Sequence, residues 1–314
     1  MEFLAPYWNF LLVHPLLSLL IAAYGFLRDF GLAIVVVTFG IRLALYPLFV
    51  TQIRSQRAMQ EVGPALNELK AKYGKDRQRM AEEQMKLYRE RGVNPAMGCL
   101  PLLIQMPILF AMYAAFIQAP LLTGDQVREL LWNISFVRDA LAPGQTLDTT
   151  ANWLPWIADC PGPNGTTLRG LACNDQLYVL PILAGISQLI ASLMAQPAKM
   201  PATQDPQAKM MQSMVYYFPI ITVVIAAGLP AGLAVYWVST TIFQIAQQYF
   251  VTGWGQLPRW IPFLRGIPTP ADRAIARGQR AAIAEVEADM SATPVKVEES
   301  DERSRARRRR RRGR

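Results

Sequence analysis

The sequence predicts an all-α polytopic membrane protein with five transmembrane helices, and three observations support this fold class. The chain of 314 residues is 52% hydrophobic and only 18% charged. Asp, Glu, Lys and Arg are absent from long runs that make up about half of the chain, and these runs lack the alternation of a barrel strand. The basic residues gather in particular segments between the runs. Because only helices and closed barrels satisfy their backbone in lipid, these observations argue against a soluble fold, a disordered chain and a barrel. The charge-free runs are residues 3–27, 92–124, 176–198 and 210–258, together with 30–53, which Arg42 alone interrupts.

The number and direction of the spans follow from run length and charge. The run 210–258 is too long for one helix, and GLPAG at 228–232 supplies a turn that divides it. Segment 54–91 carries ten basic residues and 119–175 only three, so the positive-inside rule places the first in the cytosol and the second outside. The N-terminus is then outside and the C-terminus in the cytosol. We place the spans near residues 31–51, 96–117, 177–196, 209–227 and 232–252.

The first apolar run has a different interpretation. After His14 and Pro15, only residues 16–27 continue without interruption, which is short for a span. Tyr7 and Trp8 are aromatic residues of the kind found at membrane surfaces. We favour a helix that lies on the outer leaflet over a sixth span or a signal anchor.

The cytosolic segment 54–91 has a helical pattern despite its charge. Apolar residues recur at helical spacing from Val62 to Tyr73 and again from Met80 to Tyr88, with Gly74 between them. We expect a two-helix hairpin. A docking role is favoured because a connector needs far fewer residues, and a plain connector remains the alternative.

The C-terminal segment is basic, and its end is disordered by composition. Its arginine run would bind anionic lipid head groups or the phosphates of ribosomal RNA, or serve only to anchor the topology. This run is Arg307, Arg308, Arg309, Arg310, Arg311 and Arg312. The chain is thus divided into an interfacial helix (1–28), the first span (29–53), the cytosolic hairpin (54–92), the second span (93–118), the outer loop (119–175), the third span (176–197), a cytosolic loop (198–208), the fourth and fifth spans (209–253) and the tail (254–314).

Cysteine and histidine usage offers little for a metal or a cofactor. Cys160 and Cys173 share the outer loop, and the sequence leaves open whether they form a disulfide there. There is no CxxC, no acidic cluster and a single His, so we expect no metal site and no cofactor.

Arg42 is the central candidate for a functional residue. If its helix begins near Gly31, a rise of about 1.5 Å per residue puts Arg42 roughly 16 Å deep in the membrane. A charge at that depth costs at least about 2.5–3.5 kcal/mol, and the five spans contain no Asp or Glu to compensate it. We therefore expect a hydrophilic pocket that would receive a negative charge from another molecule, with snorkelling to the surface as the alternative. Polar residues expected around Arg42 are Thr38, Gln105, Ser187, Gln188 and Ser239.

The same spans argue against several function classes. An ion-coupled transporter needs titratable groups in its spans, and these are missing. The chain also lacks HExxH, GxSxG and GxxxxGKS/T, so hydrolytic or ATP-driven work is not expected and we predict that it is not an enzyme. The function that remains is a passive or partner-driven polar path through part of the membrane. Alternatives are a small-solute channel or transporter and an assembly scaffold.

The second span, NPAMGCLPLLIQMPILFAMYAAF, resembles the signature of the YidC insertases, relatives of the mitochondrial Oxa and chloroplast Albino proteins. The blocks IRLALYPLF, LPILAGISQ, KMMQSMVYYFPI and LPAGLAVYWVSTTIFQIAQQY extend the resemblance in order from residue 7 to about 252. The large periplasmic domain and extra first helix of the Gram-negative members are missing, as is the lipoprotein Cys of the five-span bacterial form.

The resemblance implies five spans around a groove that is open to the cytosol and lipid and closed to the outside. Arg42 matches the arginine of that groove, and Gln188 and Trp237 are similar to its polar and aromatic residues. Tyr236 and Trp237 match an aromatic pair that faces substrate. Residues similar to the other side of the substrate slide are Gln105, Met106 and Ile108.

The function implied is insertion and folding of nascent membrane proteins, alone or with the Sec translocon. Its expected partners are nascent membrane proteins, the Sec translocon, a ribosome or targeting factor at the hairpin and tail, and anionic lipids. Because no basic, Ser-rich leader is present, we expect a bacterial plasma membrane rather than an organelle.

Overall fold

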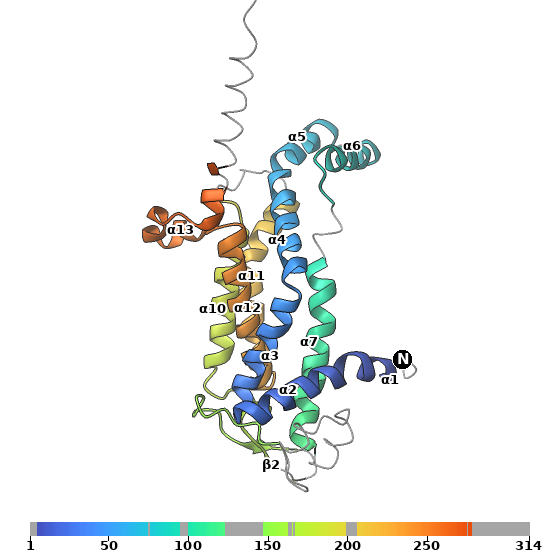
Figure 1. Ribbon diagram of the computed structural model, residues 1–314. Helices are drawn as coiled ribbons and strands as arrows, with labels where there is room; N and C mark the ends of the chain where they lie inside the picture. Colours follow the sequence, from blue (N-terminus) through green and yellow to red (C-terminus); the bar gives the residue numbers. More distant parts are fainter. Residues whose placement is uncertain are drawn as a thin grey trace, which may run out of the picture. The chain divides into compact units, whose positions relative to one another are not determined.

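The computed structural model describes residues 5–74, 76–94, 100–122, 147–162, 165, 167–198, 206–274 and 276–277. The chain separates into two compact units, residues 1–269 and 270–314. All helices and strands considered below belong to the first unit (Figure 1). The expected arginine run, Arg307 to Arg312, lies outside the described residues.

The N-terminal apolar run is helical throughout, as α1 (Ala5–Trp8), the π-helical η2 (Asn9–Val13) and α2 (His14–Leu27). The run ends at Arg28, whose φ of 56° is left-handed. Figure 1 shows α1 and α2 lying across the direction of the long helices. Residues 9–27 are long and apolar enough to cross a membrane. The transverse direction is nevertheless the one expected of an interfacial helix, which remains our interpretation.

The predicted first span, 29–53, consists of two helices rather than one. Helix α3 (Phe30–Ala44) and helix α4 (Tyr46–Glu61) meet at an angle of 71°. Pro47, in the first turn of α4, has no N–H to donate, and its ring clashes with the carbonyl four residues earlier, so a helix cannot run straight through. Helix α4 then continues past the predicted boundary to Glu61. The predicted hairpin range, 54–92, therefore begins inside α4, and its boundary at residue 54 stays a prediction.

Helices α5 (Gly63–Tyr73) and α6 (Arg77–Glu90) lie within the range 54–92 and pack against each other. Gly74 lies in the turn between them, and the Asp76 side chain accepts a hydrogen bond from the backbone N–H of Arg79 at 3.1 Å to begin α6. In Figure 1 both helices lie at the end of the first unit opposite to β2.

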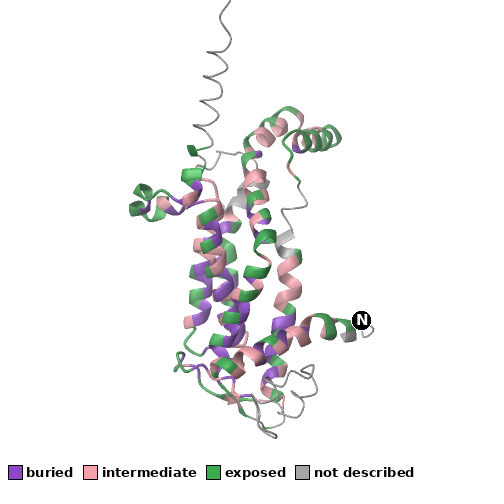
Figure 2. Ribbon diagram, viewed as in Figure 1, coloured by how far each residue is buried: buried purple, intermediate pink, exposed green. Residues whose placement is uncertain are grey.

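The remaining long helices are α7 (Leu100–Gln118), extended by η4 (Ala119–Leu121), α10 (Val179–Ala195), α11 (Pro206–Ala227) and α12 (Ala231–Val251). Helix α12 packs against α3 and α10, and α10 packs against α11. A hydrophobic core joins α2, α3, α7 and α12, and buried residues line the contacts among these helices (Figure 2). This packing brings together α3, α7 and α12, which carry Arg42, Gln105 and Tyr236 respectively.

Length and hydropathy alone identify fewer spans than we predict. Among the described residues, segments 9–27 and Leu103–Leu121 are long and apolar enough to cross a membrane. The bent pair α3–α4 also qualifies if it is counted as one span. Helix α10 and the segment Ser213–Ala227 are apolar but shorter. Helix α12 is long but carries Ser, Thr and Gln residues that lower its hydropathy. The count of five spans stays a prediction.

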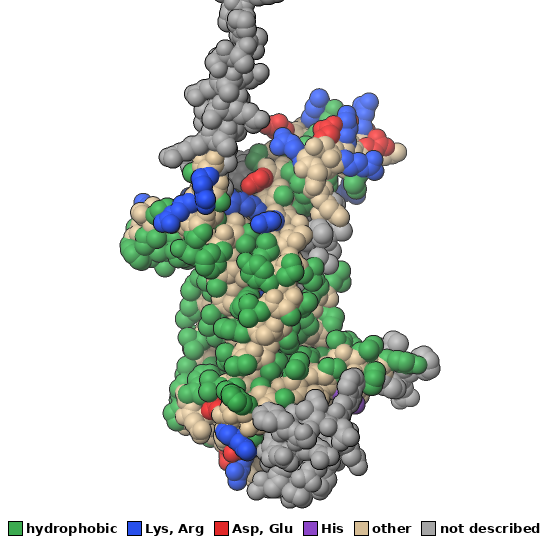
Figure 3. Space-filling model, in the orientation of Figure 1, with side chains coloured by type: hydrophobic (Ala, Val, Ile, Leu, Met, Phe, Trp, Pro, Cys, Tyr) green, Lys and Arg blue, Asp and Glu red, His purple; other side chains and the backbone are tan. Residues whose placement is uncertain are grey.

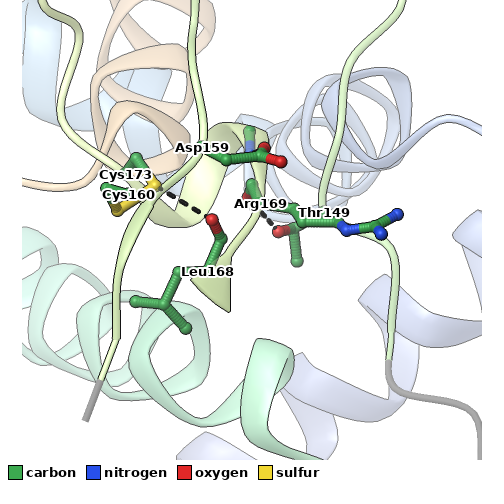
Figure 4. Close-up of a disulfide and its surroundings, with 7 residues drawn as sticks. Thr149, Asp159, Cys160, Leu168, Arg169 and Cys173 are labelled. Atoms are coloured by element: carbon green, nitrogen blue, oxygen red, sulfur yellow. Dashed lines mark hydrogen bonds between the residues drawn. A yellow bond between two sulfur atoms is a disulfide. The ribbon is translucent and has the colours of Figure 1, made fainter. Parts of the chain in front are cut away.

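The described part of the outer loop is tied to the ends of two helices. Strands β1 (Cys160–Pro161) and β2 (Thr167–Leu168) pair antiparallel, η6 (Gly170–Ala172) follows, and a disulfide joins Cys160 to Cys173 (Figure 4). The backbone N–H of Ala231, at the start of α12, donates to the Cys173 carbonyl at 2.7 Å. Asp29, at the start of α3, accepts hydrogen bonds from the Asn152 backbone N–H at 3.0 Å and from the Trp153 indole at 3.2 Å.

The beginning of the predicted tail is folded. Helix α13 (Leu257–Trp260) and the 3₁₀ helix η7 (Pro262–Gly266) follow α12. Leu257 and Leu264 are buried in a second hydrophobic cluster with residues of α10 and α11, so this part of 254–314 is ordered by apolar packing.

Candidate functional site

The guanidinium of Arg42 is buried where α3 meets α4. Its residue is only 7% exposed, and its Nη2 donates to Oε1 of Gln105 on α7 at 3.3 Å. Its Cζ lies 4.3 Å from the centre of the Phe49 ring, a cation–π contact. Phe49 belongs to α4, so this contact crosses the bend between α3 and α4.

Gln105 connects Arg42 to a third helix. Its Nε2 donates to the hydroxyl of Tyr236 on α12 at 2.8 Å. The amide of Gln105 thus uses its oxygen for the cation and its nitrogen for the phenol, which fixes its orientation. The relay Arg42–Gln105–Tyr236 holds α3, α7 and α12 in register around one buried charge.

No carboxylate compensates that charge among the described residues. The ion pair recorded there joins Arg57 to Glu61 on α4, at 3.3 Å. The same part of the chain contains no group of three or more His, Cys, Asp or Glu able to hold a metal ion. A guanidinium offers five N–H donors, and one long amide contact with one ring contact leaves most of them for water or an incoming anion.

A cavity of about 260 Å³ opens beside Arg42. Arg42 is the one charged residue among its described lining, and six glutamines and two threonines supply most of its other polar groups. Helices α4 and α12 face each other across it, and on α12 the lining positions recur every three or four residues from Trp237 to Gln247, which is one helical face. The lining residues are Arg42, Phe49, Gln52, Ile53, Gln56, Gln105, Leu109, Gln188, Phe218, Tyr236, Trp237, Thr240, Thr241, Gln244 and Gln247.

Two buried glutamines in this lining have amide atoms without a protein partner. Gln52 is 4% exposed and its Nε2 has no hydrogen-bond acceptor, and Gln247 is 3% exposed with neither amide atom bonded. A buried amide without a partner costs about 1–3 kcal/mol, so such groups are normally satisfied by water when a polar cavity adjoins them. The arrangement fits a wet cavity that also accepts the polar groups of a guest.

The cavity contains most of the groove residues expected from the sequence. Arg42, Gln105, Gln188, Tyr236 and Trp237 line it. Thr38, Ser187 and Ser239 are not among the lining residues. Their hydroxyls donate to backbone carbonyls of their own helices, those of Ile34, Ala184 and Val235. No hydrogen bond joins any of these three hydroxyls to Arg42, whose described side-chain acceptor is Gln105.

The slide residues expected on the second span divide differently. Met106 and Ile108 on α7 are half-buried and do not line the cavity, and Ile108 packs against the main hydrophobic core. Leu109, the next residue, does line the cavity. Our sequence interpretation missed Gln52, Gln56, Gln244 and Gln247. Their helical spacing on two runs was visible in the sequence, but the contact between α4 and α12 that brings the two faces together was not.

Comparisons with known proteins give the family. Residues 22–256 match the model of the 60Kd inner membrane protein family. The membrane protein insertase YidC of Alkalihalophilus pseudofirmus is 35% identical over 251 residues, which cover 77% of this chain and 81% of that protein. The corresponding protein of Oceanobacillus iheyensis is 34% identical, over 78% of this chain and 83% of its own.

Longer relatives and a solved structure also match. The insertase of Haemophilus influenzae strain PittEE is 34% identical over 78% of this chain, but the match spans only 37% of that protein. An active YidC insertase crystal structure with the first transmembrane domain resolved covers 78% of this chain and 47% of its own, at 26% identity and a TM-score of 0.45. The family match and the identities confirm the resemblance seen in the sequence. The chain belongs to the 60Kd inner membrane protein family, the family of the YidC insertases.

Proposed function

We propose that this protein inserts nascent membrane proteins into the bacterial plasma membrane through the polar cavity around Arg42, alone or with the Sec translocon. The family consists of insertases rather than enzymes, and its relatives named above are bacterial. The observation that carries the proposal is the buried guanidinium of Arg42, which has no acidic partner among the described residues and borders a cavity lined by neutral amides.

The first step is the entry of a short polar or acidic segment of the substrate into the cavity. A carboxylate that reaches Arg42 forms a charge-assisted hydrogen bond, worth about 1.5–3 kcal/mol. Gln52 and Gln247 offer donors and acceptors to the uncharged backbone of the same segment. The segment then exchanges part of its water for protein groups before it meets the hydrocarbon, which lowers the barrier to crossing.

The second step is the movement of the adjoining apolar helix into lipid. Phe218, Leu109 and Trp237 belong to the apolar part of the cavity wall, from α11, α7 and α12. Transfer of the substrate helix from water to the bilayer gains about 0.8 kcal/mol for each CH₂ group, so twenty apolar residues supply the drive without nucleotide hydrolysis.

The cytosolic ends would receive the substrate. Helices α5 and α6 carry basic and acidic side chains on their exposed surfaces, including Lys72 in the last turn of α5. We assign the docking of a ribosome or targeting factor to this hairpin and to the arginine run of the tail, with anionic lipids as further partners of the tail. The N-terminus is then outside and the C-terminus in the cytosol, as the distribution of basic residues indicates.

The test replaces Arg42 with Ala and with Lys in the purified protein, reconstituted in liposomes. The measured quantity is the initial rate of insertion of a single-span protein with an acidic outer tail, and Ser239→Ala serves as a control because its hydroxyl is buried outside the cavity. We expect Lys to retain most of the rate, since it keeps the charge, and Ala to lose about tenfold or more. Normal insertion by the Ala variant together with failure of the Lys variant would contradict the electrostatic role.

A further inference from the structure

We propose that α13 and η7 bind the membrane surface, with aromatic side chains inserted among the lipids and two arginines against anionic head groups. The segment from Leu257 to Ile267 is called the shelf below. It is separate from the cavity lining, and the inference does not rest on the insertion function.

One face of the shelf is fixed to the helices beneath it. Leu257 and Leu264 are buried against Leu193, Met194 and Val215 of α10 and α11. The backbone N–H of Gln256, just before α13, donates to the Leu193 carbonyl at 2.9 Å. At the far end, the Trp254 indole donates to the Ile267 carbonyl at 3.0 Å. The shelf is therefore held at both ends, and its other face has a defined direction.

The other face of the shelf presents exposed apolar side chains. Trp260 is 61% exposed and Phe263 is 71% exposed, and Ile261 and Ile267 are exposed beside them. Leu257 and Leu264 supply the packing against α10 and α11, and these four side chains stay outside that buried cluster. Exposed aromatic residues on a short amphipathic element are typical of the membrane–water boundary.

The apolar face continues the lipid-facing surface of α11. The Trp260 ring contacts the Tyr216 ring, with centroids 6.2 Å apart. Farther along α11, Tyr217 and Ile220 are each 61% exposed. In Figure 3 the hydrophobic side chains of the projection formed by α13 and η7 lie toward the apolar surface of the long helices, and Lys or Arg side chains lie on its other side. This is the arrangement of an element seated at an interface.

The charge of the shelf selects an anionic partner. Arg259 and Arg265 are exposed, and the Arg265 Nε donates to the Pro258 carbonyl at 3.1 Å, which holds that side chain along the shelf. Residues 252–269 contain no Asp or Glu. Each basic residue near an anionic membrane surface contributes about 1 kcal/mol, and a phosphate accepts from a guanidinium through two parallel bonds. Arginine beside tryptophan and phenylalanine thus matches the head group and the upper acyl chain of an anionic lipid.

The first experiment measures depth by electron paramagnetic resonance. The full chain with Cys99→Ser, which removes the cysteine outside the disulfide, carries a spin label at Phe263→Cys in nanodiscs of phosphatidylcholine and phosphatidylglycerol. Gly40→Cys, exposed on α3, is the immersed control, and Gly63→Cys, at the start of α5, is the aqueous control. A Cβ at either glycine meets nothing within 4 Å, so both variants should fold.

We expect the label at position 263 to collide with oxygen more often than with a water-soluble nickel chelate, as at position 40, and the label at 63 to show the reverse. Equal behaviour at 263 and 63 would overturn the proposal. So would spin–spin broadening at 263, because that signal means that a second copy of the chain covers the shelf.

The second experiment tests the charge. A fluorophore at Gly266→Cys, where a Cβ again meets nothing within 4 Å, is quenched by nitroxide-labelled phosphatidylglycerol or phosphatidylcholine. We expect the ratio of the two quenching constants to favour phosphatidylglycerol by about fivefold for each arginine. Arg259→Gln with Arg265→Gln should bring the ratio close to one. A ratio near one in the unmodified shelf, or no change on replacing both arginines, would show that anionic lipid is not the partner.

Discussion

Replacing Gln105 with Glu would place an acid where the Arg42 side chain has a neutral amide. Gln105 Oε1 lies 3.3 Å from Nη2 of Arg42, so a carboxylate of nearly the same shape would make contact without repacking. At an effective dielectric constant of about 20, opposite unit charges about 4 Å apart attract by roughly 4 kcal/mol. Desolvation of the new carboxylate removes part of this gain, and we expect the folded state to be stabilised by about 1–3 kcal/mol.

The same change should impair insertion. A substrate carboxylate would have to displace the internal one, and it would lose a charge-assisted hydrogen bond worth about 1.5–3 kcal/mol. Insertion of a single-span substrate with an acidic outer tail should then slow by about 10- to 150-fold, whereas a neutral-tailed substrate should be much less affected. The assays are the initial rate in proteoliposomes and thermal unfolding in detergent.

Gln105→Leu is the matched control, because it removes the same amide without adding a charge. It breaks the bonds to Arg42 and Tyr236, so it should lower stability by about 2–4 kcal/mol yet leave Arg42 available to an acidic substrate. We thus expect Gln105→Glu to be more stable and slower in insertion, and Gln105→Leu to be less stable but still active with the acidic substrate. An unimpaired rate for Gln105→Glu with the acidic substrate would refute the view that an unpaired guanidinium drives entry.

Three further changes test other contacts. Gln247→Leu removes two buried amide atoms without partners, so we expect thermal stability in detergent to rise by about 1–3 kcal/mol and the insertion rate to fall; a fall in stability would mean that the amide is already satisfied. Asp29→Ala removes the cap of α3 and the acceptor of Trp153, and should cost about 2–4 kcal/mol of unfolding free energy, with Asp29→Asn intermediate. Cys160→Ser breaks a disulfide with a sequence separation of 13, and should lower the free energy of unfolding by about 3 kcal/mol and expose the outer loop to protease; equal protease resistance would show that the disulfide does not hold that loop in place.

Much of the helical layout could be predicted from where charges are missing. A run without Asp, Glu, Lys or Arg needs only composition to be recognised, and α7, α10, α11 and α12 each lie largely in such a run. The bend between α3 and α4 was harder to predict. Pro47 is compatible with a kinked span or with the start of a new helix, and only the packing of α4 against α7 and α12 decides between them.

The sequence predicts the buried charge of Arg42 well, but it predicts the residues that contact Arg42 less well. Arg42 stands out because one cation in an acid-free run must be compensated. Gln105 lies 63 residues away, and its match to Arg42 depends on the rotation of α7 about its axis, which its nearly uniform apolar sequence does not reveal. Thr38 and Ser239 show the opposite difficulty: a hydroxyl at the right depth need not line the cavity, and each of these two donates to a carbonyl of its own helix.

The chemistry of the lining explains why one arginine among glutamines suits a guest of variable sequence. An acid beside Arg42 would stabilise the empty protein but satisfy the cation permanently, and further charges in the wall would hold some substrates too tightly and repel others. Glutamine donates and accepts with one neutral group, so it can bond any peptide backbone. On the proposed function, the hydrogen bonds that Arg42, Gln52 and Gln247 do not make within the protein form when a substrate enters. A cavity whose polar groups were satisfied internally would be more stable and less active.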